Sequence, residues 1–310
     1  MGKKIVSFLP SATEILYNLD VGSQVAGVTH ECTYPEEAKL KPKVITSCFD
    51  SSQLTSKEID KKIFDLVRNE TPLFILDERL LKDLQPDLIV AQGICEVCSP
   101  FKKEILHAIS ILGYHPEIII LDPHDLNDIL NNIMKIAEKV CKIQKGKSLV
   151  EFLNNKINII TNIRKNKDIQ ISSRILCLEW IDPFFTAGHW IPEMVEIAGG
   201  INGLSRKRER SKRTSFEEIK NFDPDKIILM PCGFDTDRTT NEYEKILKNN
   251  SSWNSLRAIK EKEVYVVDAG SYFSKPGPRT FVGVEVLAKI INPNEFNMIR
   301  VPSKSFMKLD

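Results

Sequence analysis

The stretch VTHECTYPEEA places four chemically versatile side chains directly after a short apolar run. They are His30, Glu31, Cys32 and Tyr34. Imidazole nitrogens and thiolate sulphurs are common protein ligands of transition metals, and carboxylates also take part. This pattern predicts that a polar or metal-containing ligand is bound where a strand ends.

A pair of cysteines follows another apolar run, which ends at Gln92. Cys95 and Cys98 have the C-x-x-C spacing of metal chelation or of a redox disulfide, and Cys32 and His30 could complete a set of soft ligands. The pair alone is half of a usual four-ligand zinc site. Thiol contacts to another ligand and plain packing therefore stay open as alternatives.

The second half of the chain carries a comparable concentration of polar chemistry. In FFTAGHWIPE, His189 and Trp190 stand in a turn before Pro192, and an exposed His-Trp turn favours contact with a ligand over core packing. His107, His115 and His124 are expected to be structural. The remaining candidate ligand-binding residues of this half are Glu179, Trp180, Glu193, Cys232, Tyr272, Phe273 and Arg279.

Alternating strands and helices are expected to position these groups. In the first half, apolar runs at 3–10, 24–30, 86–93 and 116–123 alternate with segments of helical periodicity, which is typical of parallel strands buried on both faces. Residues at the carboxyl ends of such strands lie where ligands bind in open α/β sheets. Ser11 and Glu14 have the spacing of a helix capping box, so a structural role is expected for them.

A long helical pattern separates the two halves. It runs over about 124–167 with a break near Gly146, and the strand and helix alternation then resumes to the end of the chain. The stretches 84–95 and 222–233 share Pro-Asp before a buried run that leads to a cysteine, which indicates duplication. The expected organisation is an α/β lobe over 1–142, a linker helix over 143–168 and a second α/β lobe over 169–310. These Rossmann-like lobes have mainly parallel sheets and a ligand cleft between them.

Composition narrows the classes of function. The 43 basic and 42 acidic side chains nearly cancel, so a nucleic-acid partner is not expected, and the basic run from Arg206 to Arg213 is read as a solvated loop. No apolar run reaches the ~18 residues of a membrane span. Only IVSFL precedes Pro10, which is too short for a signal peptide, so a cytoplasmic location is expected. Phosphate-binding, dinucleotide and serine-hydrolase motifs are missing from the sequence.

Four stretches carry a resemblance to a known family. SFLPSATEILYNLDVGSQVAGVTHECTYPEEA, LQPDLIVAQ, DPFFTAGHWIPEMVEIAGGIN and YFSKPGPR resemble the vitamin B12 and iron-siderophore substrate-binding proteins of ABC importers, which have the class III periplasmic-binding-protein fold with a helical backbone. The resemblance covers nearly the whole chain. It implies two lobes that grip one ligand, an ABC permease as partner, and permease docking through Glu58 and Glu196. That family is usually periplasmic or extracytoplasmic.

The sequence departs from its cobalamin-binding relatives at the ligand. Those proteins stack aromatic side chains on the corrin, whereas the corresponding positions here hold Glu31, Gln92 and a residue in 47–49. Buried carboxylates and thiolates need donors or cations, so a polar or metal-containing ligand is expected.

Three hypotheses follow for the function. The first is a non-catalytic protein that binds a corrinoid, another metal complex or a small polar metabolite, with cobalamin or a transition metal as the bound group. The second is a metal- or cluster-dependent cytoplasmic enzyme that uses Cys32, Cys95 and Cys98. The third is an interaction module that has lost its ligand.

Overall fold

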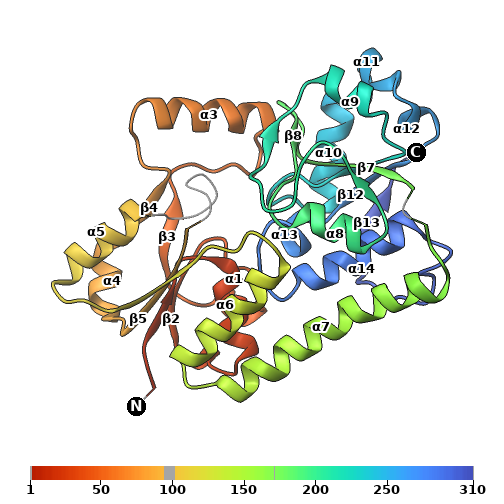
Figure 1. Cartoon of the computed structure of the whole chain (residues 1–310). Coiled ribbons are helices and arrows are strands. Elements are labelled where there is room, and N and C mark those ends of the chain that lie inside the picture. The colour runs from red at the N-terminus through yellow and green to blue at the C-terminus, as the bar shows by residue number, and fades with distance from the viewer. Residues whose placement is uncertain (1, 94–101, 171, 310) are drawn as a thin grey trace. The chain divides into compact units, whose positions relative to one another are not determined.

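A computed structural model describes residues 2–93, 102–170 and 172–309 of the chain (Figure 1). The chain forms two compact units. Unit 1 comprises Met1–Gln53, Lys61–Pro123 and Asn127–Glu151, and unit 2 comprises Leu54–Asp60, His124–Leu126 and Phe152–Asp310.

Unit 1 contains a six-stranded sheet in the order β4-β3-β2-β1-β5-β6 within the described residues. Its strands are β1 (Ile5–Ser7), β2 (Val25–Thr29), β3 (Lys43–Ser47), β4 (Phe74–Leu76), β5 (Leu88–Gln92) and β6 (Glu117–Leu121). Neighbouring strands are parallel except for the antiparallel edge pair β3 and β4. All five residues of β5 are buried, as expected of a central parallel strand covered on both faces.

Helices connect these strands. They are α1 (Pro10–Asn18), the 3-10 turn η1 (Gly22–Gln24), α2 (Glu36–Lys39), α3 (Ser56–Arg68), α4 (Glu78–Leu84), α5 (Lys102–Leu112) and α6 (Leu126–Lys139). On one face of the sheet, Phe8, Val44 and Ile89 pack with Leu81 of α4 and Ala108 of α5 in a fully buried cluster.

The first helix does not begin as the sequence predicted. Pro10 occupies its first turn and Leu9 is the N-cap residue, with no side-chain cap hydrogen bond. Ser11 and Glu14 are buried within the helix. The capping-box prediction for these two residues is wrong because proline starts the helix one residue earlier.

The break in the long helical pattern also lies elsewhere. The α6 helix ends at Lys139, Cys141 adopts a left-handed conformation with φ of 56°, and α7 runs over Ile143–Asn166. Gly146 lies inside α7, where an added Cβ would come within 2.6 Å of the Ala137 Cβ. This glycine therefore permits close packing of two helices and does not end one.

Unit 2 contains a second sheet, in which β10-β8-β7-β11-β12-β13 are successive neighbours and β9 also pairs with β7. Its strands are β7 (Arg174–Trp180), β8 (Phe185–Thr186), β9 (Ile201–Asn202), β10 (Lys212–Arg213), β11 (Lys226–Leu229), β12 (Val264–Val267) and β13 (Phe306–Lys308). The β7, β9, β11 and β12 strands run parallel, and the short strands β8, β10 and β13 are antiparallel to their neighbours.

Helices on this sheet complete the core of unit 2. They are α8 (Ile191–Ile197), α9 (Phe216–Phe222), α10 (Thr236–Ile246), α11 (Ser251–Asn254), α12 (Arg257–Lys260), α13 (Ala269–Tyr272) and α14 (Thr280–Ile291). Leu178 of β7 and Val266 of β12 belong to a buried cluster with Ile219, Tyr243 and Trp253 from the helices. Both units thus confirm the predicted α/β class with mainly parallel sheets. Among the described residues, no helix combines the length and the apolar character that a membrane span requires.

Candidate functional site

In unit 1, His30 and Glu31 lie at the carboxyl end of β2. The Nε2 atom of His30 is 3.6 Å from Oε1 of Glu31, and the two side chains are 30% and 46% exposed. The backbone N–H of His30 donates to the carbonyl of Ile45, which fixes the residue against β3. Its Nδ1 atom is buried without a hydrogen-bond partner in the described residues. The strand end therefore presents a partly exposed imidazole and carboxylate, and their role in ligand binding stays a prediction.

Cys32 lies nearby but is fully buried. Its Sγ atom is 3.1 Å from Oγ1 of Thr13 and 3.5 Å from Oγ1 of Thr29. The Thr13 hydroxyl also donates to Oγ of Ser7 at 2.9 Å. The thiol thus belongs to a packed polar network that satisfies buried hydroxyl groups.

The proposed soft-ligand set cannot be assembled from the described residues. Cys95 and Cys98 lie outside them, and no group of three or more His, Cys, Asp or Glu side chains elsewhere in the described part of the chain could hold a metal ion. The metal site predicted from these cysteines and His30 stays a prediction.

The other candidates in unit 1 differ in exposure. Tyr34 is 44% exposed and precedes a cis peptide bond to Pro35. Gln92 is 9% exposed at the end of β5. Tyr34 is therefore accessible to a ligand, whereas most of Gln92 is enclosed by the sheet.

In unit 2, the GHW turn joins β8 to α8. Trp190 is 5% exposed, and its Nε1–H donates to the carbonyl of Phe273 at 2.9 Å. Phe273 is itself 2% exposed. Their contact holds the turn against the loop that precedes α14. His189 is only partly buried, so its ring is more accessible to a ligand than the ring of Trp190.

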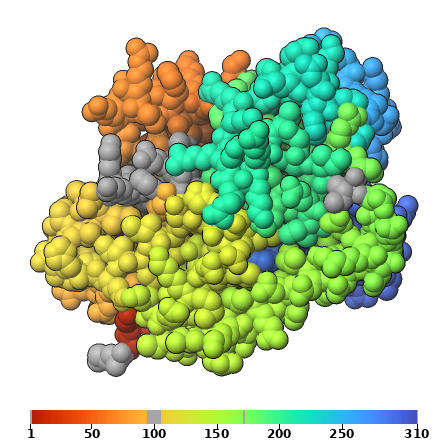
Figure 2. Space-filling view, viewed as in Figure 1, coloured from red at the N-terminus to blue at the C-terminus, as the bar shows by residue number. Residues whose placement is uncertain are grey.

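The basic segment, residues 206–213, folds onto this turn. Its end forms β10, which pairs with β8, and the N–H of Gly188 donates to Oγ of Ser211 at 3.1 Å. The N–H of His189 donates to the carbonyl of Glu209 at 2.6 Å. Arg206, Arg208 and the other cations of the segment remain exposed, and Figure 2 shows this part of the chain in teal at the surface of unit 2. The predicted solvated loop is thus exposed, with its backbone tied to the GHW turn.

Ion pairs fasten the same region. Glu193 accepts hydrogen bonds from the backbone N–H of Leu126 at 2.9 Å and from Nζ of Lys207 at 2.5 Å. The hydrogen bond to Glu193 raises the pKa of Lys207. Asp125 is paired with the guanidinium of Arg208. Glu193 therefore links three chain segments of unit 2, which are its own helix α8, the segment that contains Leu126 and the basic segment.

The GHW turn also contacts His124, a residue for which the sequence predicted a structural role. The ring centroids of His124 and His189 are 6.0 Å apart with an interplanar angle of 34°. His124 follows β6 by three residues, at a position that the sequence marks only as a turn. The sequence feature that could have marked His124 as a candidate is its position just beyond the end of a strand.

Residues 54–60 contact the carboxyl end of β7 and the helix α10. The Nε1–H of Trp180 donates to the carbonyl of Ser56 at 3.1 Å, and the N–H of Ser56 donates to Oε1 of Glu242 at 2.6 Å. Ser56 is fully buried, and Glu242 is 4% exposed. Phe234 lies edge-on to Trp180, with the Arg238 guanidinium 3.7 Å above its ring. The indole N–H, the only side-chain donor of Trp180, therefore helps to hold residues 54–60 in place.

The remaining candidates in unit 2 lie around these strand ends. The carbonyl of Glu179 accepts from the N–H of Cys232 at 3.1 Å, which links β7 to the loop after β11. Tyr272 ends α13, and Arg279 is the N-cap residue of α14. Both are partly buried, as are Glu179 and Cys232.

The two glutamates expected to dock a permease are exposed. Glu58 accepts hydrogen bonds from the backbone N–H and the hydroxyl of Thr55, and these lower its pKa. Glu196 lies in the last turn of α8, where its carbonyl accepts from Arg164. Each carboxylate is therefore available to a partner.

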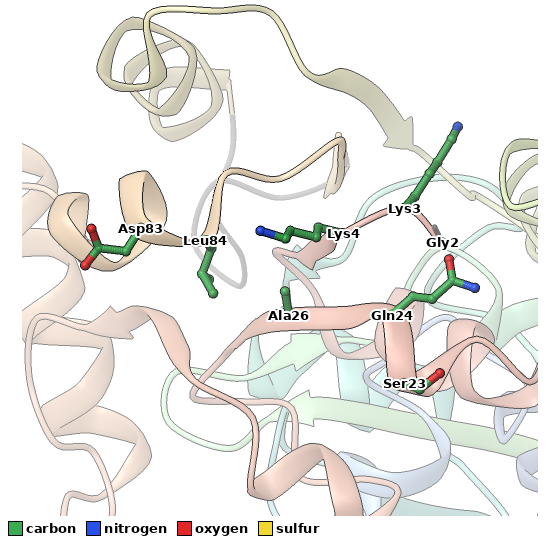
Figure 3. A pocket seen from close by; sticks show the side chains of 8 residues that line it. All are labelled: Gly2, Lys3, Lys4, Ser23, Gln24, Ala26, Asp83 and Leu84. Atoms are coloured by element: carbon green, nitrogen blue, oxygen red, sulfur yellow. The ribbon is translucent and has the colours of Figure 1, made fainter.

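A hollow of about 350 Å³ lies at the opposite edge of the unit 1 sheet (Figure 3). It is lined by Gly2, Lys3, Lys4, Ser23, Gln24, Ala26, Asp83 and Leu84. These residues precede β1, lie before or at the start of β2, or end α4, and Figure 3 shows Lys4 extending toward Leu84. Because ligand sites of open α/β sheets lie at carboxyl strand ends, this amino-end hollow is separate from the candidate site.

Comparison with known proteins identifies relatives over most of the chain. Residues 5–270 match the family model described as periplasmic binding protein. An uncharacterized ABC transporter substrate-binding lipoprotein of Bacillus subtilis, YvrC, is 26% identical over 299 residues, which are 95% of this chain and 81% of that protein.

Solved structures share the fold. A periplasmic heme-binding protein from Pseudomonas aeruginosa superposes with a TM-score of 0.71 at 18% identity, covering 95% of this chain and 94% of the other. The vitamin B12 binding protein BtuF of Vibrio cholerae superposes with a TM-score of 0.67 at 19% identity, covering 94% and 97%.

Proposed function

The chain belongs to the periplasmic binding protein family and is a non-catalytic protein that binds a small ligand, and we propose that this ligand is a metal complex of the corrinoid type. We further propose that it delivers this ligand to an ABC permease. The observation that carries the choice of ligand is the presence of partly exposed imidazoles at the candidate strand ends, His30 in unit 1 and the pair of His124 and His189 in unit 2.

The chemistry of these side chains supports a metal complex over a purely organic metabolite. Neutral imidazole is a common ligand of transition metals, and it also donates hydrogen bonds to polar substituents. Glu31 beside His30 can accept hydrogen bonds from amide groups, which corrinoids carry at their periphery. The relatives named for vitamin B12 and heme bind compounds of the same broad class by their names.

A thermal-shift series tests the ligand. The full chain is heated with cyanocobalamin, aquocobalamin, hemin or a ferric siderophore, and a compound present at 100 times its Kd stabilises the native state by about 2.7 kcal/mol. The expected result is a rise in melting temperature with at least one cobalamin. No shift with any of the four compounds at millimolar concentration overturns the proposal.

Variants connect the shift to the candidate residues. His30→Ala should reduce the cobalamin shift, whereas His115→Ala, an exposed histidine of the same unit, should not. Equal shifts in both variants would remove His30 from the site.

The proposed permease contact has its own test. Glu58→Lys and Glu196→Lys should lower ligand-stimulated ATP hydrolysis by the cognate reconstituted transporter while leaving ligand binding intact. Glu151→Lys, an exposed glutamate on α7, is the matched control. The cytoplasmic location expected from the sequence is a separate prediction, which cell fractionation with an antibody to the chain tests.

A further inference from the structure

Two cations, Lys4 and Arg174, occupy equivalent positions in the two units. Each stands at the start of the first strand of its sheet, β1 or β7. The backbone N–H of Lys4 donates to Oδ2 of Asp87 at 2.7 Å, and that of Arg174 donates to Oδ2 of Asp225 at 2.6 Å. These aspartates belong to the Pro-Asp pair that both units share. The strands then pair in the same register, because the residue after each cation lies opposite the residue after each aspartate.

In unit 2 this corner of the sheet is filled by ion pairs. Asp223 is the C-cap residue of α9, with φ of 47°. Arg174 donates to the Asp223 carboxylate at 2.6 Å and to the carbonyl of Phe222 at 3.1 Å. Arg257 donates to the same carboxylate at 3.2 Å and to the carboxylate of Asp225 at 2.5 Å. Each charge of this corner therefore has an opposite charge beside it.

In unit 1 the matching C-cap residue is Gln85, at the end of α4 and with the same φ of 47°. A neutral amide thus stands where unit 2 has the Asp223 carboxylate. Lys4 extends toward Leu84, the last residue of α4 (Figure 3). Among the residues that the structure describes, its Nζ atom has no hydrogen-bond or ion-pair partner. The ammonium of Lys4 therefore lacks the carboxylate that its counterpart Arg174 has.

This ammonium borders the hollow of about 350 Å³ at the amino ends of the unit 1 strands, a volume at the lower end of the ~300–1,000 Å³ of small-molecule sites. Lys3, the other cation of the lining, is already paired with Glu117 at 2.7 Å. Asp83 is an exposed carboxylate of the lining, and within the described ranges no cation pairs with it. The partly buried side chains of Ala26 and Leu84 add apolar surface.

We propose that the hollow binds a small zwitterion, a free amino acid with an apolar side chain. Its carboxylate pairs with Lys4, in the role that the Asp223 carboxylate has toward Arg174 in unit 2, and its ammonium pairs with Asp83. A phosphate dianion fits less well, because the Asp83 carboxylate repels it. The site goes beyond the proposed function, since it lies at the amino ends of the strands, whereas ligands of open α/β sheets bind at the carboxyl ends.

Titration of the isotope-labelled full chain with L-leucine, followed by heteronuclear NMR, tests the site. L-Leucine should shift the amide signals of Lys4 and Leu84 at millimolar concentration, because ion pairs exposed to water are weak. Isocaproate is leucine without its ammonium, and isopentylamine is leucine without its carboxylate. Both should bind roughly 2–5-fold more weakly than leucine. Unchanged signals of the hollow in the presence of L-leucine overturn the proposal.

Variants that remove one charge connect the binding to the two side chains. Lys4→Gln and Asp83→Asn should each weaken leucine binding by roughly 2–5-fold. Lys61→Gln and Asp65→Asn remove exposed charges of α3 elsewhere in unit 1, so they are matched controls and should leave the affinity unchanged. Equal affinities in all four variants would remove Lys4 and Asp83 from the site.

Gln85→Asp tests the comparison of the two units directly. It gives unit 1 the carboxylate that unit 2 has at Asp223, and aspartate tolerates the left-handed conformation. The new carboxylate should pair with Lys4 and abolish the leucine-dependent shifts, whereas the neutral Gln85→Asn should keep them. Circular dichroism checks that both variants fold. Undiminished leucine binding by folded Gln85→Asp contradicts the proposal, and if this variant does not fold, Lys4→Gln and Asp83→Asn decide.

Discussion

Substitution of Gly188 by alanine should damage the GHW turn more than any loss of a single hydrogen bond there. A Cβ at this position would lie 2.5 Å from the backbone N of Ser211 and 2.6 Å from both the carbonyl carbon of Arg210 and the carbonyl oxygen of Glu209. All three are backbone atoms, so no side-chain rotation can relieve the clash. The basic segment has to move away from the turn.

The cost follows from two contributions. Overpacking of a close contact costs about 1–3 kcal/mol. Movement of the segment also weakens the hydrogen bonds from His189 N–H to Glu209 and from Gly188 N–H to Ser211, each worth roughly 0.5–1.5 kcal/mol. The sum is about 2–6 kcal/mol, and 1 kcal/mol shifts the melting temperature of a unit of 150–250 residues by about 2–4 °C. Gly188→Ala should therefore melt at least about 4 °C lower than the wild type.

Ser211→Ala is the matched comparison, because it removes the hydroxyl that accepts from Gly188 without adding an atom to the contact. Both variants are melted in parallel by circular dichroism. The smaller decrease is expected for Ser211→Ala. The reasoning is refuted if Gly188→Ala is as stable as Ser211→Ala, since the backbone clash would then cost nothing.

Two further predictions concern unit 2. Burial raises the pKa of Asp225, but hydrogen bonds from Arg174 and Arg257 outweigh this effect and leave the pKa below its usual value. These hydrogen bonds stabilise the folded state above the unfolded-state pKa of about 3.9. The stabilisation is lost as the pH falls toward the folded-state pKa. The melting-temperature gap between wild type and Asp225→Asn should thus be widest near neutral pH and shrink below about pH 4, and a constant gap across the pH range would contradict this assignment. Ser215 and Glu218 form a capping box at the start of α9, so Ser215→Ala should cost roughly 0.5–2 kcal/mol and Ser215→Gly only a few tenths in urea unfolding, whereas equal costs would argue against the cap.

The sequence was sufficient for the fold class because buried parallel strands are nearly continuous apolar runs. The Val25–Thr29 and Leu88–Gln92 strands were predicted for this reason. The two strands at the β4 side of the sheet were not: Lys43–Ser47 and Phe74–Leu76 are partly exposed, so their composition does not distinguish them from loops. Their place in the sheet depends on pairing partners that the local pattern does not encode.

The candidate site was predictable only where a side chain follows a strong strand. His30 meets that condition and is partly exposed just after β2, and its role in ligand binding stays a prediction. Neither the burial of Cys32 nor that of Trp190 could be predicted, because each depends on residues distant in the sequence, Thr13 and Phe273. His124 was missed for the same reason, since its contact with His189 depends on how a turn folds onto another segment.

The segment Leu54–Asp60 has a practical consequence for dividing the chain. It belongs to unit 2 although the chain on both sides of it belongs to unit 1. A fragment that begins at Phe152 would lack Ser56, leaving the enclosed carboxylate of Glu242 without its amide donor and the indole of Trp180 without its acceptor. Expression of the C-terminal half by itself should consequently give an unstable product, and adding a synthetic peptide of residues 54–60 in trans is the way to rescue it.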